Sequence, residues 1–219
     1  MLRACSAAWR EARPAVVGVV AILVVALGLR SPWLAALALG LFGWLACFFR
    51  DPERTPGSPS PDALLAPADG RVTAIETVDE PRFMGGPARR VSIFLSLLDV
   101  HVQRSPCDGV VGWLEYRPGT FAPAYSAGAE RNESNLIGLE TAHGRMAVRQ
   151  VAGVLARRIV CWPAIGDRLR RGQRLGLIKF GSRVDLFLPP HAEVLVRVGQ
   201  RVRAGQTVVA SLPLDSARL

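Results

Sequence analysis

The sequence predicts a mostly β domain, of the flattened β-sandwich or barrel-sandwich-hybrid kind, preceded by a membrane-associated N-terminal helical hairpin. Three observations predict it: two charge-free apolar runs near the N-terminus, many short apolar runs between turn residues, and an internal repeat with paired glycines. The 219 residues are 50% hydrophobic with a net charge of +9, which excludes a disordered tail and a disulfide mini-scaffold. We expect a hairpin at 1–50, a linker at 51–67 and the β domain at 68–219.

The hairpin is predicted from residues 14–29 and 31–49, which contain no charged side chain and are separated only by Arg30. Each run is close to the ~20 residues that cross a bilayer core, although both are on the short side. Arginines lie outside the two runs, at Arg3, Arg10, Arg13, Arg50 and Arg54. The positive-inside rule therefore places both ends of the hairpin, and the β domain, on the cytoplasmic face of the cell (inner) membrane.

Two other interpretations of the apolar runs stay open. A cleaved signal peptide has one apolar core followed by a small-residue cleavage site, whereas a second apolar run follows here almost at once. A hairpin buried in a soluble core, or lying in the membrane interface without crossing it, also fits because both runs are short.

Beyond the hairpin, the pattern changes from helical to β. Residues 51–67 are rich in Pro, Ser and Gly without periodicity, which is typical of a loop. Short apolar or alternating runs, bounded by Gly, Pro and Asp, then predict strands. These span residues 71–78, 90–97, 109–116, 145–151, 157–161, 175–178, 184–188, 193–198 and 207–212. Only a short helix, near 96–99 or 122–129, interrupts them.

An internal repeat supports this architecture, because residues 165–175 and 198–208 match at a spacing of 33. Each copy has two glycines six residues apart, Gly166 and Gly172 in the first and Gly199 and Gly205 in the second. This spacing predicts a turn, a short strand and a second turn, with each glycine at positive φ. The pattern resembles the turn of biotinyl and lipoyl domains. A carrier domain would need a modified lysine at a hairpin tip, whereas Lys179 lies between two apolar strands.

Cysteine and arginine usage narrows the function classes. The four cysteines, Cys5, Cys47, Cys107 and Cys161, form no CxxC pair, so neither a disulfide framework nor a zinc site is expected. Every basic residue except Lys179 is an arginine, which suits the phosphates of anionic lipids or a merely solvated face. No aromatic-interleaved basic run indicates nucleic acid.

Histidines and loop motifs exclude most familiar enzyme sites. His101, His143 and His191 have no metal-ligand spacing, so a metal centre is not expected. The chain contains no G-x-S-x-G elbow, no Walker loop and no dinucleotide fingerprint. Without a functional role, His101 would be a half-buried histidine after a strand, and His143 and His191 would be turn residues.

One short segment offers chemistry of its own, because Gly181-Ser182 interrupts an apolar β-like run at 177–189. In a strained turn the serine hydroxyl can attack the preceding carbonyl, since glycine lets that carbonyl bend towards Oγ without a Cβ clash. The ester can then eliminate across the serine Cα–Cβ bond, which splits the chain and, after loss of ammonia, leaves an N-terminal pyruvoyl group. Gly-Ser is also common in β-turns, so the pair needs its sequence context.

That context resembles the phosphatidylserine decarboxylases, and within them the short bacterial and archaeal type. The likeness runs through nearly the whole β domain, in the family's order. Its blocks are Phe48-Phe-Arg-Asp-Pro-Glu-Arg54, Pro67-Ala-Asp-Gly70, Val91-Ser-Ile-Phe-Leu-Ser96, Asp99-Val-His101, Gly119-Thr-Phe121, Ala152-Gly153, Ala156-Arg-Arg-Ile-Val160, Gly166-Asp167 and the segment 176–189. Many blocks in one order are more specific than any single block.

The resemblance implies a proenzyme that cuts itself between Gly181 and Ser182. The products would be a β chain, 1–181, and an α chain, 182–219, which stay together as an α/β heterodimer and leave a higher oligomer open. Ser182 would become a pyruvoyl cofactor, whose ketone forms a Schiff base with the amine of phosphatidylserine and takes up the electrons released as CO₂ leaves. Phosphatidylethanolamine would be the product, with no metal and no pyridoxal phosphate.

The resemblance also assigns site residues. Asp69 matches the acidic member of the self-cleavage machinery, and His101 the histidine of the decarboxylation step, where an imidazole can transfer a proton. Longer relatives carry a second histidine that activates the serine, and Arg104 stands at that position here. Either His101 serves both steps, or Asp69 works with another group, or cleavage depends on strain. Asn132-Glu133-Ser134 replaces a family Asn-Glu-Arg.

Two other functions stay open beside the decarboxylase. A membrane-anchored, lipoyl-like adaptor explains the hairpin and the repeat, but leaves Gly181-Ser182 and His101 unexplained. A non-processing, catalytically silent relative is allowed by Arg104. Without the family context, Asp69 before Gly70 is an ordinary turn residue.

Overall fold

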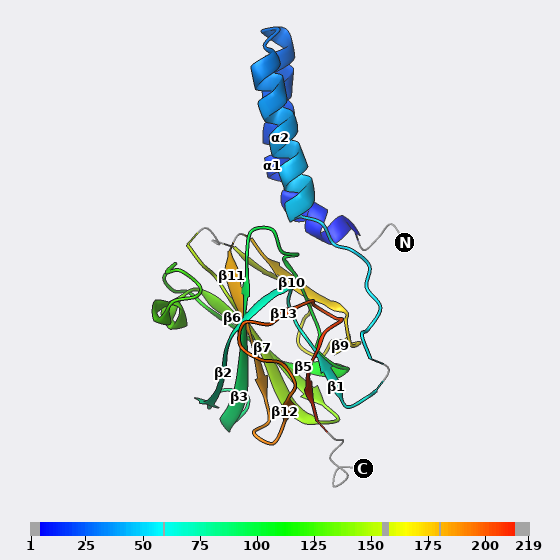
Figure 1. The fold of residues 1–219 in the computed structure, drawn as a ribbon, viewed down its shortest axis with the longest axis vertical. Helices are drawn as coiled ribbons and strands as arrows, with labels where there is room; N and C mark the ends of the chain where they lie inside the picture. The colour runs from blue at the N-terminus through cyan, green and yellow to red at the C-terminus, as the bar shows by residue number, and fades with distance from the viewer. Residues whose placement is uncertain (1–4, 59, 155–157, 180, 213–219) are drawn as a thin grey trace. The chain divides into compact units, whose positions relative to one another are not determined.

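The computed structural model of the chain describes residues 5–58, 60–154, 158–179 and 181–212. It divides into two compact units, Met1–Pro52 and Glu53–Leu219. The first unit is the predicted helical hairpin, with α1 at Cys5–Gly28 and α2 at Pro32–Phe48 (Figure 1). Arg30, in the turn, has a φ of 50°. Of the helices described, the stretch Ala8–Gly28 is long and apolar enough to cross a membrane, and α2 is a shorter apolar helix.

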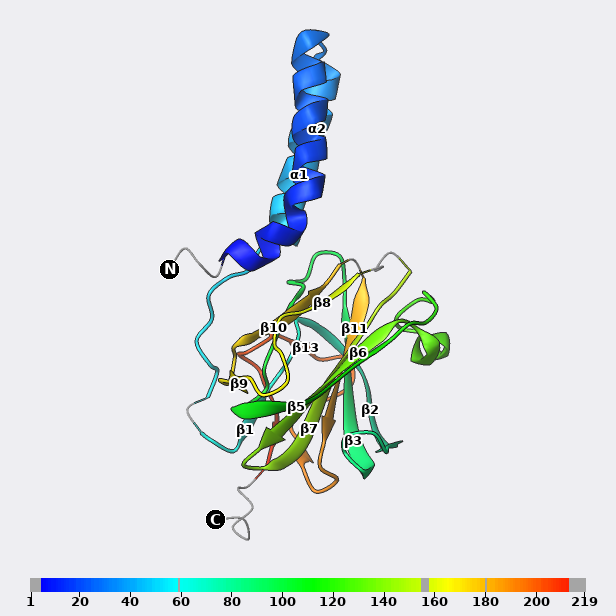
Figure 2. The ribbon, with the colours of Figure 1, turned by 180° about the vertical axis from the view of Figure 1, so that it is seen from behind.

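The second unit is built from β-strands, as predicted. Its large sheet has eight strands in the order β13-β2-β3-β11-β7-β6-β5-β9, and it is curled (Figures 1 and 2). Two three-stranded sheets, β1-β14-β12 and β4-β10-β8, complete the described part of the domain. The prediction of a mostly β fold with an N-terminal helical hairpin is confirmed.

The strands have these bounds: β1 Ala63–Leu65, β2 Gly70–Glu80, β3 Gly86–Leu95, β4 Val102–Arg104, β5 Gly109–Arg117, β6 Ser134–Thr141, β7 Gly144–Val151, β8 Ile159–Cys161, β9 Arg168–Leu169, β10 Arg174–Ile178, β11 Ser182–Leu188, β12 Glu193–Val194, β13 Arg201–Val202 and β14 Val208–Ser211. Every pairing between them is antiparallel. Alternate side chains therefore point to opposite faces, and the inward face of β11 contributes Val184, Leu186 and Leu188 to the main apolar core.

The structure differs from the sequence predictions at several places. The central strand β6 was not predicted, because its polar and apolar residues do not alternate and all but its last two residues are buried. Strand β1 lies inside the predicted linker, where residues 63–67 are buried. The predicted helix at 96–99 is a turn, and the one at 122–129 is a short 3₁₀ helix, η1, at Ala127–Arg131. Of the predicted strand 157–161, residue 157 lies outside the described residues.

The internal repeat forms the predicted turn, strand and turn in both copies. All four glycines, at 166, 172, 199 and 205, have φ between 70° and 92°. The strand between the glycines is β9 in the first copy, paired with β5, and β13 in the second, paired with β2. The N–H of Gly166 donates to the carbonyl of Val111, and the N–H of Gly199 donates to that of Val72. The repeat therefore closes the two edges of the large sheet in the same way.

Candidate active site

Gly181-Ser182 lies at the start of β11, in the middle of the large sheet. Ser182 is opposite Leu95 at the end of β3, and the next residue, Arg183, is opposite Val151 at the end of β7. Ser182 is fully buried, and its Oγ has no hydrogen-bond partner among the described residues. A buried hydroxyl without a protein partner is uncommon, because most buried polar side chains are hydrogen-bonded. Such a hydroxyl is available for chemistry on its own peptide bond.

The carbonyl of Gly181 is held against another glycine. Gly181 has a φ of 47°, so a side chain at this position would be strained. A Cβ added to Gly153 would lie 2.1 Å from the oxygen of Gly181 and 3.3 Å from the Cβ of Ala124. Only glycine at 153 leaves room for this carbonyl, which belongs to the peptide bond that the sequence predicts to be cut. Gly153 acts through its lack of a side chain.

His101 approaches the same segment from β4. Strands β4 and β10 pair with Val102 opposite Leu177, so His101 comes next in register, beside Ile178. The ring is fully buried, and its Nδ1 lies 2.9 Å from the carbonyl oxygen of Asp99. A neutral ring that donates from Nδ1 has its basic lone pair on Nε2. His101 is therefore fully buried rather than half-buried at the surface. Ile178, beside it on the neighbouring strand, precedes Ser182 by four residues.

A chain of buried amides fixes the backbone of His101. Gln103 Nε2 donates to the carbonyl of His101 over 2.7 Å, and Gln150 Nε2 donates to Gln103 Oε1 over 2.9 Å. Asn135 Nδ2 then donates to Gln150 Oε1 over 3.0 Å. The three amides come from β4, β7 and β6, so their contact depends on the tertiary fold. Sequence reasoning did not find them, and nothing in their spacing could have indicated this chain.

Asn132 connects the loop before β6 to the segment around Gly153. Its Nδ2 donates to the carbonyls of Ala122 and Ala152, both over 2.8 Å, and its Oδ1 accepts from the N–H of Ala122. Ala152 directly precedes Gly153, so this amide holds the strand end that packs on the Gly181 carbonyl. Asn132 is the part of the segment 132–134 that matches the expected family pattern. Here its side chain positions the loop before β6.

Asp69 lies at the same end of the sheet, two strands from Ser182. The next residue, Gly70, packs so closely on β3 that a Cβ would lie 2.0 Å from the carbonyl oxygen of Phe94. The carboxylate of Asp69 forms a two-pronged ion pair with Arg54, over 2.5 and 2.8 Å, and accepts the N–H of Ala204 over 2.8 Å. Among the described residues, these contacts tie Asp69 to the second repeat, with no hydrogen bond to Ser182.

Arg104 is bound to the repeat. Its Nη1 donates to the carbonyl of Gly172 over 2.9 Å, and its side chain is 4% exposed. Strand alternation places it on the opposite face of β4 from Gln103 and His101. Arg104 therefore supports a turn of the first repeat.

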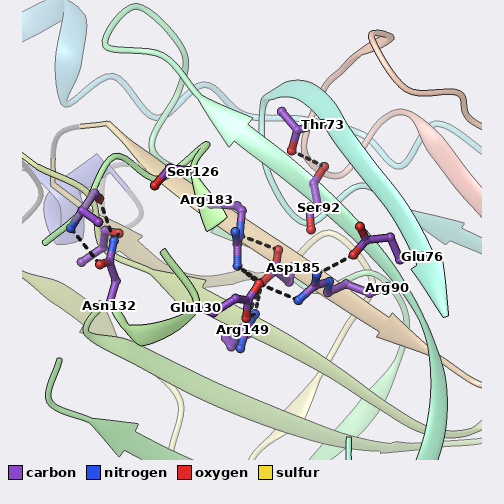
Figure 3. Close-up of polar contacts among 12 residues, drawn as sticks. Thr73, Glu76, Arg90, Ser92, Ser126, Glu130, Asn132, Arg149, Arg183 and Asp185 are labelled. Carbon is purple, nitrogen blue, oxygen red and sulfur yellow. Dashed lines mark hydrogen bonds and ion pairs between the residues drawn. The ribbon is translucent and has the colours of Figure 1, made fainter. Parts of the chain in front are cut away.

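Three arginines gather on the outer face of the strands beside Ser182 (Figure 3). Arg183 and Arg149 both bind the fully buried carboxylate of Asp185, with contacts of 2.9 and 2.7 Å. Glu130, from η1, bridges Arg90, Arg149 and Arg183, each over 2.8 Å. Burial acts to raise the pKa of Glu130, but the charges of the three arginines outweigh it and lower that pKa to about 2. This ion-pair cluster fixes the residue that directly follows Ser182.

The remaining candidates lie elsewhere. His143 and His191 line a pocket with Glu140 and Pro189, at the turns after β6 and β11, the opposite end of β11 from Ser182. Within the described residues, no group of three His, Cys, Asp or Glu side chains is placed to hold a metal ion. Burial raises the pKa of the Cys107 thiol to about 12. Part of the block 156–160 and the end of the predicted α chain, 213–219, lie outside the described residues.

Comparison with known proteins gives one consistent family. A family model described as phosphatidylserine decarboxylase matches residues 41–210. A phosphatidylserine decarboxylase proenzyme of Symbiobacterium thermophilum is 53% identical over 93% of this chain and 95% of its own length. Proenzymes of the same name from Salinibacter ruber and Burkholderia cenocepacia are 48% and 41% identical, over 84% and 93% of this chain and 82% and 95% of their own lengths.

Proposed function

Because the chain belongs to the phosphatidylserine decarboxylase family, and is therefore a decarboxylase, we propose that it converts phosphatidylserine to phosphatidylethanolamine and CO₂. The reaction centre would be a pyruvoyl group made from Ser182 by self-cleavage. The observation that carries this proposal is the buried, unpartnered Oγ of Ser182 beside a carbonyl that only Gly153 accommodates.

Self-cleavage uses atoms of the chain alone until its last step. Ser182 Oγ attacks the carbonyl carbon of Gly181, and the peptide C–N bond breaks as an ester forms. Loss of the Ser182 Cα proton then breaks the Cβ–Oγ bond, which leaves a carboxylate on Gly181 and a dehydroalanine at 182. Water hydrolyses the imine tautomer of that residue, releasing ammonia and leaving the ketone. Positive φ at Gly181, which glycine adopts without strain, turns its carbonyl towards Gly153 and leaves no side chain beside it.

The chain's own groups have distinct proposed roles. His101, with its basic Nε2, moves protons at Oγ before cleavage and at the reacting carbon afterwards. Asp69, held by Arg54, is the acidic member of the cleavage step. Once formed, the pyruvoyl group would supply an electron sink for decarboxylation. It would occupy the first position of β11, between the ends of β3 and β7.

The two chains would stay together after cleavage. Strand β11 pairs with β3 along its whole length and with β7 over five residues. The ion pairs of Arg183 with Glu130, and of Asp185 with Arg149, also cross between the two products. These contacts would keep the new end of the α chain in place. The hairpin would hold the domain at the cytoplasmic face of the cell membrane, where the substrate lies.

Intact-protein mass spectrometry tests the proposal on purified wild-type chain and two variants. We expect the wild type to yield the 182–219 fragment with a blocked N-terminus, lighter than the unmodified fragment by the difference between serine and pyruvoyl. Ser182→Ala should remain one chain, whereas Ser58→Ala, a serine in the segment before β1, should be processed normally. A single intact chain in the wild type would overturn self-cleavage and favour a non-processing relative.

A further inference from the structure

Four loops leave the large sheet at the end where Ser182 lies. Ser182 is opposite Leu95, the last residue of β3, so the loop after β3 starts beside it. Val151, the last residue of β7, is opposite both Arg183 and Ser134, the first residue of β6. The described residues 96–101, 118–133, 152–154 and 181 therefore share one end of the domain. Figures 1 and 2 show β11 in the large sheet from its two sides.

These loops expose large apolar side chains. The exposed fraction is 71% for Leu98, 71% for Tyr125 and 50% for Val154. We use the name apolar rim for Leu97, Leu98, Phe121, Tyr125 and Val154, which are all exposed. The rim is continuous with the site, because the Tyr125 ring packs edge-on against Phe94, next to Leu95, and Ala124 lies beside Gly153.

The opposite ends of the same strands are different. Among the described residues, the turns at 81–85, 142–143 and 189–192 contain no exposed large hydrophobic side chain, and Phe83 in the first of them is buried. The contrast cannot come from general surface composition, because both sets of loops belong to the same sheet. Several large apolar groups exposed on adjoining loops mark an interaction surface.

Exposed charges around the apolar rim are mostly basic. Arg131, Arg158 and Arg201 are exposed at its edges, and Arg201 also reaches Asp99 at 3.7 Å. Arg117, at the end of β5, is exposed as well. The acidic residues of these loops are engaged: Asp99 caps its own turn through Ser96, and Glu130 bridges the arginine cluster. Basic residues around an apolar centre are complementary to an anionic lipid surface.

We propose that the apolar rim is the surface by which the catalytic domain docks on an anionic phospholipid bilayer, independently of the helical hairpin. The proposal rests on the proposed function, because a phospholipid head group must travel from the membrane to Ser182. Docking by this end places the buried start of β11 directly over the interface. The head group then reaches the site while its acyl chains stay in the lipid, which avoids exposing them to water.

Two positions of matched exposure test the docking itself, without reference to activity. Leu98 is 71% exposed on the apolar rim, and Ile165 is 66% exposed in the first repeat, beside the start of β5. We would introduce Leu98→Cys or Ile165→Cys into the full chain with Cys5 and Cys47 replaced by Ser, and reconstitute it in vesicles of phosphatidylcholine and phosphatidylglycerol. A membrane-impermeant maleimide should label position 98 at least about tenfold more slowly than position 165, because bilayer contact buries it. Equal labelling rates would overturn docking.

A second measurement links docking to turnover. We expect Leu98→Ser with Val154→Ser to lower activity on phosphatidylserine in vesicles by about tenfold, while activity on a short-chain, monomerically dissolved phosphatidylserine stays unchanged. Ile165→Ser should change neither. Equal loss on both substrates would overturn the proposal, and would indicate that the apolar rim packs against the hairpin or a second copy. A wild type inactive on both substrates would instead contradict the proposed function, and the labelling rates would still decide the docking.

Discussion

Residues 65–72 and 104–111 have the same local structure but different surroundings. Each contains Pro-x-Asp-Gly, at 67–70 and at 106–109, and each precedes a long strand, β2 or β5. Asp69 accepts the N–H of Ala204, and Asp108 accepts the N–H of Arg171, which are equivalent positions in the two repeats. The two segments also pair with each other through Leu65 and Pro106, and Arg104 and Pro67. The domain therefore has an approximate internal symmetry.

The difference between the halves lies in what surrounds the carboxylates. Asp69 is buried and also binds Arg54, whereas Asp108 is exposed. The half that contains Asp69 adjoins β3 and, through it, Ser182, while β5 is separated from β11 by β6 and β7. Turn capping explains why both halves have the aspartate, so the cap alone says nothing about catalysis. Only the added arginine and the position near Ser182 distinguish Asp69.

The largest expected effect separates these two roles of the aspartates. Asp69→Asn should slow self-cleavage by about 100-fold, because the amide no longer supplies the charge paired with Arg54. Asp108→Asn should process at the wild-type rate, since it loses only a turn contact. The measurement is the fraction of cleaved chain against time, by mass spectrometry. Equal rates in the two variants would show that Asp69, like Asp108, is a turn residue.

A smaller difference is expected between the second glycines of the two repeats. Gly172→Ala and Gly205→Ala both place a side chain at positive φ, which costs about 1 kcal/mol of unfolding free energy. At 205 the new Cβ would also lie 3.0 Å from the Cδ of Arg104, so we expect about 1 kcal/mol more. Denaturant unfolding in a Ser182→Ala background measures both. A larger loss at 172 would contradict the packing described for Arg104.

The third prediction concerns the ion-pair cluster of Glu130 with Arg149 on β7 and Arg183 on β11, the strands between the two halves. The pKa of Glu130 is about 2, below its ordinary value, so its stabilising effect is complete above about pH 4.5 and is lost as the pH falls towards 2. Wild type and Glu130→Gln should therefore differ in unfolding free energy at pH 7 and converge in acid. Glu140→Gln, at an exposed position outside the ion-pair cluster, is the control and should leave the unfolding free energy at pH 7 close to that of wild type. A constant difference would mean that the ion-pair cluster does not act through charge.

The smallest effect is expected where the second half differs from the first by one buried atom. Cys107 occupies the position of Ala68 in the other half, and burial raises the pKa of its thiol to about 12. The folded protein should not react at Cys107 with a thiol reagent at pH 8. Cys107→Ala should lower the unfolding free energy by less than about 1 kcal/mol. Rapid labelling of Cys107 in the native protein would show that this half opens easily.

Local patterns were sufficient for several features of the fold. The charge-free runs predicted the two helices, and the glycine spacing of the repeat predicted four positive-φ turns, because both depend on residues close in the chain. Strand β6 was missed, since a strand buried on both faces has no alternation to detect. The second Pro-x-Asp-Gly, at 106–109, is present in the sequence. Only the structure shows that it is equivalent to the first, because both aspartates cap equivalent turns of the repeats.

The sequence by itself determined the hairpin, the β class of the domain, the family and the candidate bond at Gly181-Ser182, because each depends on local pattern or on motif order. The tertiary structure decided the surroundings of that bond. It brings Gly153 onto the Gly181 carbonyl, places His101 beside Ile178, and attaches Arg104 to Gly172. These contacts join residues from about 30 to 80 positions apart, and antiparallel register, which no single strand contains, sets which side chains meet.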